Sequence, residues 1–314
     1  MYNKKMQKIR LFQKNIFPEH FQLHSEFHQK LRITLNELGY QETWCPPLST
    51  SPCFETHVHP FEIFSCRDSK NAHLYLHTSP EFVLKNYLCQ IASTTQTGIF
   101  NLNYVFRDDR PGAIHRRQFI MLEFYRTSAP VEKLIEDLTC LILSAATMVA
   151  EKYEVIPLPN IERITVDELF QERLKFSILD YLDEYSLYEK IQKDFPQNAP
   201  SRILPWDDLY NILWLNYIEP TLSHFPGVFI ENFPVHLGLL AKVNDNDHRI
   251  SQRFELFIKG QEIANGYSEE VNYDQNLVAI EHHLQQKRAI YQYQIPKPEF
   301  FLNSLKTKGM KKSY

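Results

Sequence analysis

The sequence predicts an α+β fold in which an antiparallel β-sheet is flanked by helices. Three observations lead to this prediction. Aromatic residues make up 13% of the 314 residues, which favours a substantial sheet. Strand-like segments follow one another across short polar turns, as antiparallel strands do. Segments with helical spacing of apolar residues lie among them, and no linker divides the chain, so we expect one domain over residues 1–314.

Three helices are expected in the first half of the chain. Apolar residues recur at helical spacing from Ser25 to Leu38, and Gly39 follows as a stop signal. Ser79-Pro80 is a start signal for a second helix, because proline is favoured in the first turn. Residues 128–152 begin in the same way and predict the third and longest helix.

The clearest strand pattern is a hairpin formed by residues 102–107 and 118–126. In its second strand, Phe119 and Glu123 share one face, whereas Ile120 points to the other. A face that mixes aromatic residues with a carboxylate suits a binding site more than a core. Further strands are expected after a helical insertion near residues 160–225, at residues 227–230, 253–259 and 262–267.

Composition excludes two common kinds of phosphate site. The chain has only 8 glycines, with no Gly-x-Gly pair and no Gly followed by Lys-Ser or Lys-Thr. Rossmann and P-loop cradles are therefore not expected, and side chains must hold any phosphate. The net charge of −4 gives no general electrostatic reason to expect binding to nucleic acid.

Several features predict a cytoplasmic protein. The 5 cysteines are odd in number and include no Cys-x-x-Cys, so reduced thiols are expected rather than a disulfide framework. The N-terminus is polar and basic, unlike a signal peptide. The longest apolar run, residues 138–150, is too short to span a bilayer, which needs roughly 20 residues.

The loop of the hairpin is a candidate anion site. Residues 106–119 contain four arginines, two aspartates and one histidine. Arginine matches phosphate oxygens with two parallel hydrogen bonds, and Phe119 could stack on a base. The alternative is a solvated hairpin tip, which charged loops often are.

Carboxylates and histidines suggest further sites. Glu255, Glu262 and Glu269 lie on consecutive strands and the turn after them, where they could hold Mg²⁺ or an ammonium group. The alternative is three unrelated surface glutamates. His57 and His59 could form a metal pair, but no third ligand is near in the sequence, which favours loop histidines with ordinary hydrogen bonds.

Three blocks of sequence resemble the lysyl subgroup of class II aminoacyl-tRNA synthetases. The hairpin is similar to motif 2 of that family through Phe106-Arg107-Asp108-Asp109, His115 and Phe119-Ile120-Met121-Leu122-Glu123. Thr78-Ser79-Pro80-Glu81 with Lys85 resembles the segment before motif 2, and residues 253–269 resemble the acidic strand pair. The helix ending at Gly39 and the following Pro46-Pro47 resemble motif 1, which forms the dimer in the family.

The likeness is closest to the short paralogues that modify elongation factor P. Only about 20 residues precede the first helix, which leaves no N-terminal OB-fold anticodon-binding domain. Asp247-His248-Arg249 also matches the paralogues. The resemblance implies ATP-dependent activation of lysine or β-lysine as an aminoacyl-adenylate, and transfer to a lysine of elongation factor P. It further implies Mg²⁺ and a homodimer, with tRNA binding not expected.

The resemblance also implies roles for individual residues. Arg107 would be catalytic and would hold the α-phosphate. Asp109 and Phe119 would contact adenine, and His115 would lie near the outer phosphates. Glu255 and Glu262 would hold the metal. The residues implied around the amino acid are Ser79, Glu81, Gln118 and Glu269.

The sequence departs from the family pattern at several positions. Asp109 stands where the family has Glu, and Arg110 stands where it has an acidic residue. Ala113 occupies a position that is usually Arg in the family, and Gln118 a position that is usually Glu. No Gly-x-Asp-Arg occurs, so motif 3, whose Arg covers ATP, is expected to be missing. These departures leave two alternatives open: an impaired paralogue that binds nucleotide, amino acid or a protein partner, and a tRNA-charging enzyme.

Overall fold

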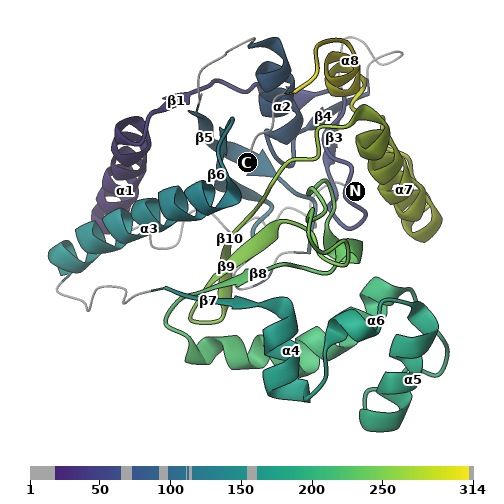
Figure 1. Ribbon diagram of the computed structural model, residues 1–314. Coiled ribbons are helices and arrows are strands. Elements are labelled where there is room, and N and C mark those ends of the chain that lie inside the picture. The colour runs from purple at the N-terminus through teal and green to yellow at the C-terminus, as the bar shows by residue number, and fades with distance from the viewer. Residues whose placement is uncertain are drawn as a thin grey trace, which may run out of the picture.

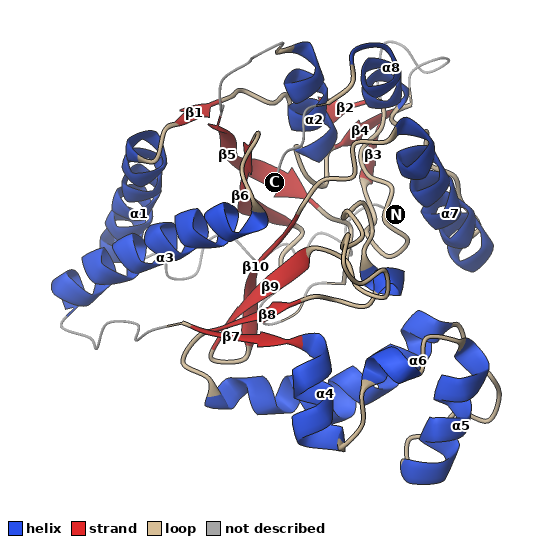
Figure 2. Ribbon diagram, in the orientation of Figure 1, coloured by secondary structure: helices blue, strands red, loops and turns tan. Residues whose placement is uncertain are grey.

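The structure, a computed structural model, describes residues 18–64, 73–91, 98–110, 112, 115–153 and 161–310. Ala113, one of the departures noted above, lies outside these residues. The described chain combines helices with three β-sheets, which confirms the predicted α+β class (Figure 1). The sheets occupy the middle of the molecule and the helices surround them (Figure 2).

The first sheet contains the predicted hairpin. Its order is β1-β5-β6, formed by β1 (Tyr40–Glu42), β5 (Gly98–Phe106) and β6 (Gln118–Arg126). The hairpin strands β5 and β6 pair antiparallel over their whole length, from Gly98↔Arg126 to Phe106↔Gln118. β1 pairs with β5 in parallel, which the sequence pattern does not predict because β1 has only 3 residues.

The second sheet carries the acidic strand pair. Its order is β10-β9-β8-β7, formed by β7 (Glu162–Thr165), β8 (Val228–Glu231), β9 (Arg253–Ile258) and β10 (Gln261–Tyr267). β8, β9 and β10 are antiparallel, as predicted, whereas β7 pairs with β8 in parallel. A Cβ on Gly266 would lie 2.5 Å from Cζ of Phe254, so glycine lets β10 lie against that ring.

A small third sheet and the helices complete the core. The sheet has the order β2-β4-β3, from β2 (Leu48–Ser49), β4 (Leu74–Leu76) and β3 (Phe61–Ile63). Two helices, α1 (Pro18–Glu37) and α3 (Val131–Tyr153), pack together beside the first sheet (Figure 1). Three more helices cluster around the third sheet: α2 (Glu81–Gln90), α7 (Tyr273–Tyr291) and α8 (Glu299–Lys308).

The predicted helix boundaries hold at one end better than at the other. α1 includes Ser25, the expected start, as an internal residue and begins already at Pro18. It ends before Gly39, as predicted, because Gly39 has a φ of +85° that other residues rarely adopt. α2 begins directly after Ser79-Pro80.

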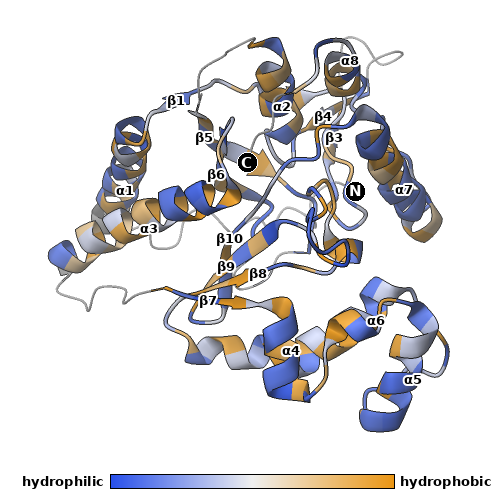
Figure 3. Cartoon of the chain, in the orientation of Figure 1, coloured by the Kyte–Doolittle hydropathy of each residue, from blue (hydrophilic) through white to orange (hydrophobic). Residues whose placement is uncertain are grey.

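The helical insertion has a core of its own. It contains α4 (Val166–Leu174), α5 (Glu184–Asp194), α6 (Trp206–Leu213) and shorter helical turns up to His224. Figure 3 shows hydrophobic and hydrophilic residues on α6, whereas α5 is mainly hydrophilic. The core continues onto the second sheet through Val228, Ile230 and Phe257. The insertion therefore covers the face of β9 that also carries Glu255.

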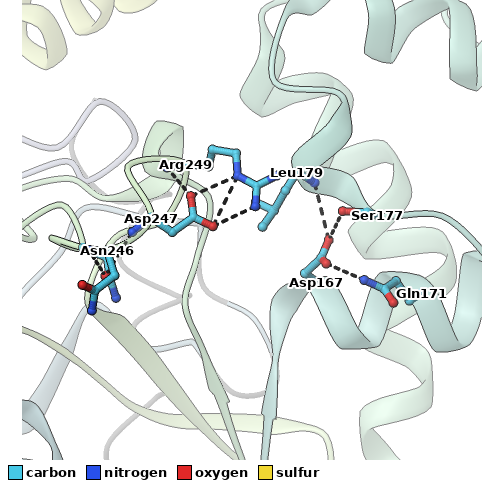
Figure 4. Close-up of polar contacts among 8 residues, drawn as sticks. Asp167, Gln171, Ser177, Leu179, Asn246, Asp247 and Arg249 are labelled. Carbon is cyan, nitrogen blue, oxygen red and sulfur yellow. Dashed lines mark hydrogen bonds and ion pairs between the residues drawn. The ribbon is translucent and has the colours of Figure 1, made fainter.

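A surface loop meets this insertion. Asp247 and Arg249 form an ion pair with Nη2–Oδ2 2.8 Å, and Arg249 extends toward Leu179 of the insertion (Figure 4). On the insertion side, Asp167 accepts hydrogen bonds from Ser177 and Gln171. The hydrogen bonds from Arg249 lower the pKa of Asp247 to about 2.

One ion pair is buried under the first sheet. Nε of Arg126 lies 2.6 Å from Oδ2 of Asp137, which also accepts a hydrogen bond from Tyr40 at 2.7 Å. Arg126 donates a further hydrogen bond to the carbonyl of Leu38. This network ties α1, β6 and α3 together at the point where three elements meet.

Candidate functional site

A cavity of about 570 Å³ lies between β6 and β10. Among the described residues, β6 pairs only with β5 and β10 only with β9, so both strands present an unpaired edge to this cavity. Apolar side chains of α3 and β9 close its back. The polar lining residues are Glu55, Ser79, Glu81, Arg107, Asp109, His115, Arg116, Glu123, Glu262, Asn265, Tyr267 and Glu269.

Basic side chains gather at one end. Arg107 leaves β5 at the hairpin, where its backbone N–H donates to the carbonyl of Arg117. Its guanidinium lies over the ring of Phe119, 5.4 Å from the ring centre, and Nε donates to the carbonyl of Thr78 at 3.3 Å. These contacts hold the guanidinium group of Arg107 at the wall of the cavity, and its remaining N–H groups are available to an anion.

Carboxylates gather at the other end, around a buried lysine. Lys85 is 0% exposed. Its Nζ lies 2.6 Å from Oε1 of Glu81 and 2.7 Å from Oε2 of Glu269. Tyr267 donates a hydrogen bond to the same Glu81 oxygen at 2.8 Å. Burial alone would lower the pKa of Lys85, but the two carboxylates raise it above its ordinary value.

Two more carboxylates face this end. Glu123 accepts a hydrogen bond from Tyr125 at 2.7 Å, and burial together with the Glu81 charge raises its pKa to about 8. Burial and Glu81 also raise the pKa of Glu55, and burial raises that of Glu269 to about 7. Once these carboxyl groups have lost their protons, four carboxylates face one lysine, and this excess of negative charge suits a cationic ligand.

Glu255 and Glu262 lie on the same face of the second sheet. Glu255 is directly opposite Asn265, whose side chain donates to Glu262 at 3.3 Å. Burial raises the pKa of Glu255 to about 7, although Arg253 pairs with it at 2.6 Å. Mg²⁺ takes one or two carboxylates together with phosphate oxygens, and of this pair Glu262 lines the cavity whereas Glu255 does not. Among the described residues, no group of three acidic, histidine or cysteine side chains could hold a metal.

The structure brings most of the predicted residues to one cavity. The lining includes Ser79, Glu81, Arg107, Asp109, His115, Phe119, Glu262 and Glu269. Glu255 lies behind it. Gln118, the first residue of β6, is not among the lining residues. The structure therefore does not place Gln118 with the other residues predicted to contact the amino acid.

Sequence reasoning missed Glu55 and did not assign a role to Lys85 or Glu123. A signal existed for Glu123, which is the one carboxylate on the alternating strand β6. Glu55 lies in an irregular loop with no pattern to mark it. His57 and His59 are loop histidines with ordinary hydrogen bonds, as predicted, to Tyr291 and Tyr293.

The fold and the cavity define a class II synthetase-type catalytic domain, and comparison with known proteins agrees. The family model for class II tRNA synthetases (D, K and N) matches residues 3–312. The chain therefore belongs to this family, as its motifs predict.

Similar curated proteins narrow the likeness. The chain is 32% identical over 249 residues to a protein of Aquifex aeolicus named elongation factor P–(R)-β-lysine ligase homolog, covering 78% of this chain and 76% of that protein. It is 28% identical to the elongation factor P–(R)-β-lysine ligase of Erwinia tasmaniensis, covering 76% and 70%. The ligase of that name from Proteus mirabilis is 27% identical, covering 88% and 81%. No helix in the described part of the chain is long and apolar enough to cross a membrane.

Proposed function

We propose that this protein uses ATP to activate lysine or β-lysine as an aminoacyl-adenylate and transfers the acyl group to a lysine side chain of elongation factor P. The observation that carries the proposal is a cavity whose lining contains both an arginine beside an aromatic ring and a cluster of carboxylates. Arg107 and Phe119 offer a phosphate and base site, and Glu81, Glu123 and Glu269 offer sites for amines. The names of the similar proteins support the same substrates.

The reaction needs little chemistry from the protein beyond binding and charge. The carboxylate of the amino acid attacks the α-phosphorus, an O–P bond forms, and the bond to pyrophosphate breaks. The nucleophile is already an anion, so no general base is required. Arg107 would stabilise charge on the α-phosphate, and carboxylates at the far end would orient the amines. Mg²⁺ held by Glu255 and Glu262 would neutralise the phosphates.

The decisive experiment measures ATP–pyrophosphate exchange with residues 1–314. Exchange that depends on lysine or β-lysine and not on alanine, followed by labelling of elongation factor P, would support the proposal. ATP and lysine binding without exchange would contradict the proposal. It would instead favour the impaired paralogue, a reading that fits the unpaired edges of β6 and β10 among the described residues.

Lysine binding is expected to strengthen as the pH rises from about 6 to 8.5. Burial raises the pKa values of Glu269 to about 7 and Glu123 to about 8, and each must lose its proton to pair with an ammonium group. Calorimetry in buffers of different ionisation enthalpy will report the released protons. An affinity that stays constant over this range would contradict the assignment. Both pKa values exceed the unfolded value near 4.5, so the folded protein binds these protons more tightly than the unfolded chain. The ligand-free protein should therefore lose stability as the pH rises from about 4.5 to about 8.

We expect no specific tRNA binding at physiological salt. The net charge of −4 supplies no general attraction to RNA phosphates. Filter binding with lysine tRNA and an unrelated tRNA measures this. A tight complex that prefers the lysine tRNA would replace the ligase proposal with that of a tRNA-charging enzyme.

We also propose a homodimer in the cytoplasm. An exposed apolar surface supports the dimer: Trp44 is 86% exposed, and Tyr104 on β5 and its cross-strand neighbour Ile120 are also open. Light scattering is expected to give about twice the chain mass of 37.3 kDa, and Trp44→Asp should return the monomer. A wild-type mass of one chain at micromolar concentration would rule this out.

A further inference from the structure

Lys85 has no role in the reaction described above, although it lies at the centre of the carboxylate end. It belongs to α2, one turn after Glu81, and it is fully buried. Its ammonium group bridges two carboxylates that come from distant parts of the chain, Glu81 on α2 and Glu269 after β10. The ring of Tyr267 covers it, with Nζ 5.2 Å from the ring centre.

The contacts leave part of each carboxylate free for a ligand. Lys85 contacts Oε1 of Glu81 and Oε2 of Glu269. The second oxygen of each side chain is not used by the lysine, and both residues line the cavity. A ligand ammonium would therefore bind the oxygen of each carboxylate that Lys85 does not contact.

The carboxylates around Lys85 explain why a cation is needed at this position. The charged groups that face Lys85 are Glu81 on its own helix, Glu269, and Glu123 on β6. Its other titratable neighbours are Cys89 and Tyr267. Without Lys85, three buried carboxylates would face one another. Like charges in a buried site favour the protonated form, which pairs poorly with an ammonium group.

We propose that Lys85 is a positioning residue for the binding of a diamino acid. Its ammonium group fixes the direction of the Glu81 and Glu269 side chains and favours their charged forms, so that both carboxylates can pair with the amines of the ligand. The inference rests on the proposed binding of the amino acid by these two carboxylates. A lysine with a purely structural role would stabilise the fold, but its removal would not change the pH at which Glu269 loses its proton.

The first test needs no ligand. The carboxyl carbons of ¹³C-labelled glutamate are titrated by NMR in the wild type, Lys85→Met and Lys85→Gln, with Glu269→Gln to assign the signal. We expect the Glu269 midpoint to rise by about one to three pH units in both Lys85 variants. An unchanged midpoint overturns the proposal. Lys85→Gln keeps a hydrogen-bond donor, which guards against a Met variant that does not fold.

The second test measures lysine affinity by calorimetry between pH 6 and pH 9. In the Lys85 variants we expect a loss of about tenfold or more at pH 7 that recovers as the pH rises, because the carboxylates then ionise without help. Lys190→Met is the control, because Lys190 also pairs with a carboxylate, that of Asp194, but lies on α5 of the insertion and outside the cavity. It should leave the pH profile unchanged.

The two tests separate this inference from the proposed function. A raised Glu269 midpoint in a protein that binds no lysine would support the role of Lys85 in setting charge and overturn the amino-acid site. Lysine binding by the wild type with parallel pH profiles in all variants would keep the site and overturn the role of Lys85.

Discussion

Replacing Arg107 with alanine is expected to weaken ATP binding by about 2–5 kcal/mol, a factor of roughly thirty to several thousand. The guanidinium is fixed by Phe119 and by the carbonyl of Thr78, so its position does not depend on the ligand. A fixed fork binds phosphate with little loss of side-chain entropy. Titration calorimetry with ATP measures the change. Arg107→Lys should lie between the wild type and Arg107→Ala, because it keeps the charge and loses the fork.

Arg249→Ala provides the control for this experiment. Arg249 is also an arginine with a charged partner, Asp247, but it is on the surface beside the insertion and outside the cavity (Figure 4). Its removal should leave ATP affinity unchanged. Equal ATP affinity in wild type and Arg107→Ala would mean that the hairpin is a solvated tip, the alternative that its composition left open.

Asp137→Ala is expected to destabilise the protein by about 3–5 kcal/mol. The side chains of Arg126 and Asp137 are only 9% and 1% exposed, so the variant leaves the arginine charge buried with no carboxylate beside it. Tyr40 would lose its hydrogen-bond acceptor as well. Urea unfolding followed by circular dichroism measures the free energy of unfolding.

Two companion variants test the cause of this loss. Lys133 also pairs with Asp137, but it is 40% exposed, so Lys133→Ala should cost less than about 1 kcal/mol. In the double variant Arg126→Met with Asp137→Leu, neither charge is left unpaired, and stability should recover much of the loss. A double variant as unstable as Asp137→Ala would show that packing, rather than the unpaired charge, causes the effect.

Local sequence patterns predicted much of the fold because local physics dictates those elements. The strand predicted from Gln118 to Arg126 has the bounds of β6, and its Leu122 and Phe124 pack on the core that α1 and α3 share. Ser79-Pro80 and Gly39 marked helix ends through backbone restrictions that act wherever the residues occur. The parallel strands β1 and β7 were not predicted, because strands of 3 and 4 residues are too short to show a period.

The sequence alone determined the α+β class, the membership in the class II synthetase family, and the residue types of both ends of the site. The tertiary structure decided which carboxylates meet. Glu81 and Tyr267 are 186 residues apart in the chain yet share a hydrogen bond, and Lys85 forms an ion pair with Glu269, which is similarly far away in the sequence. The tertiary structure also decided that Glu55 lines the cavity and that Gln118 does not. Sequence patterns report the face on which a residue lies, whereas burial and charge depend on neighbours that only the packed chain supplies.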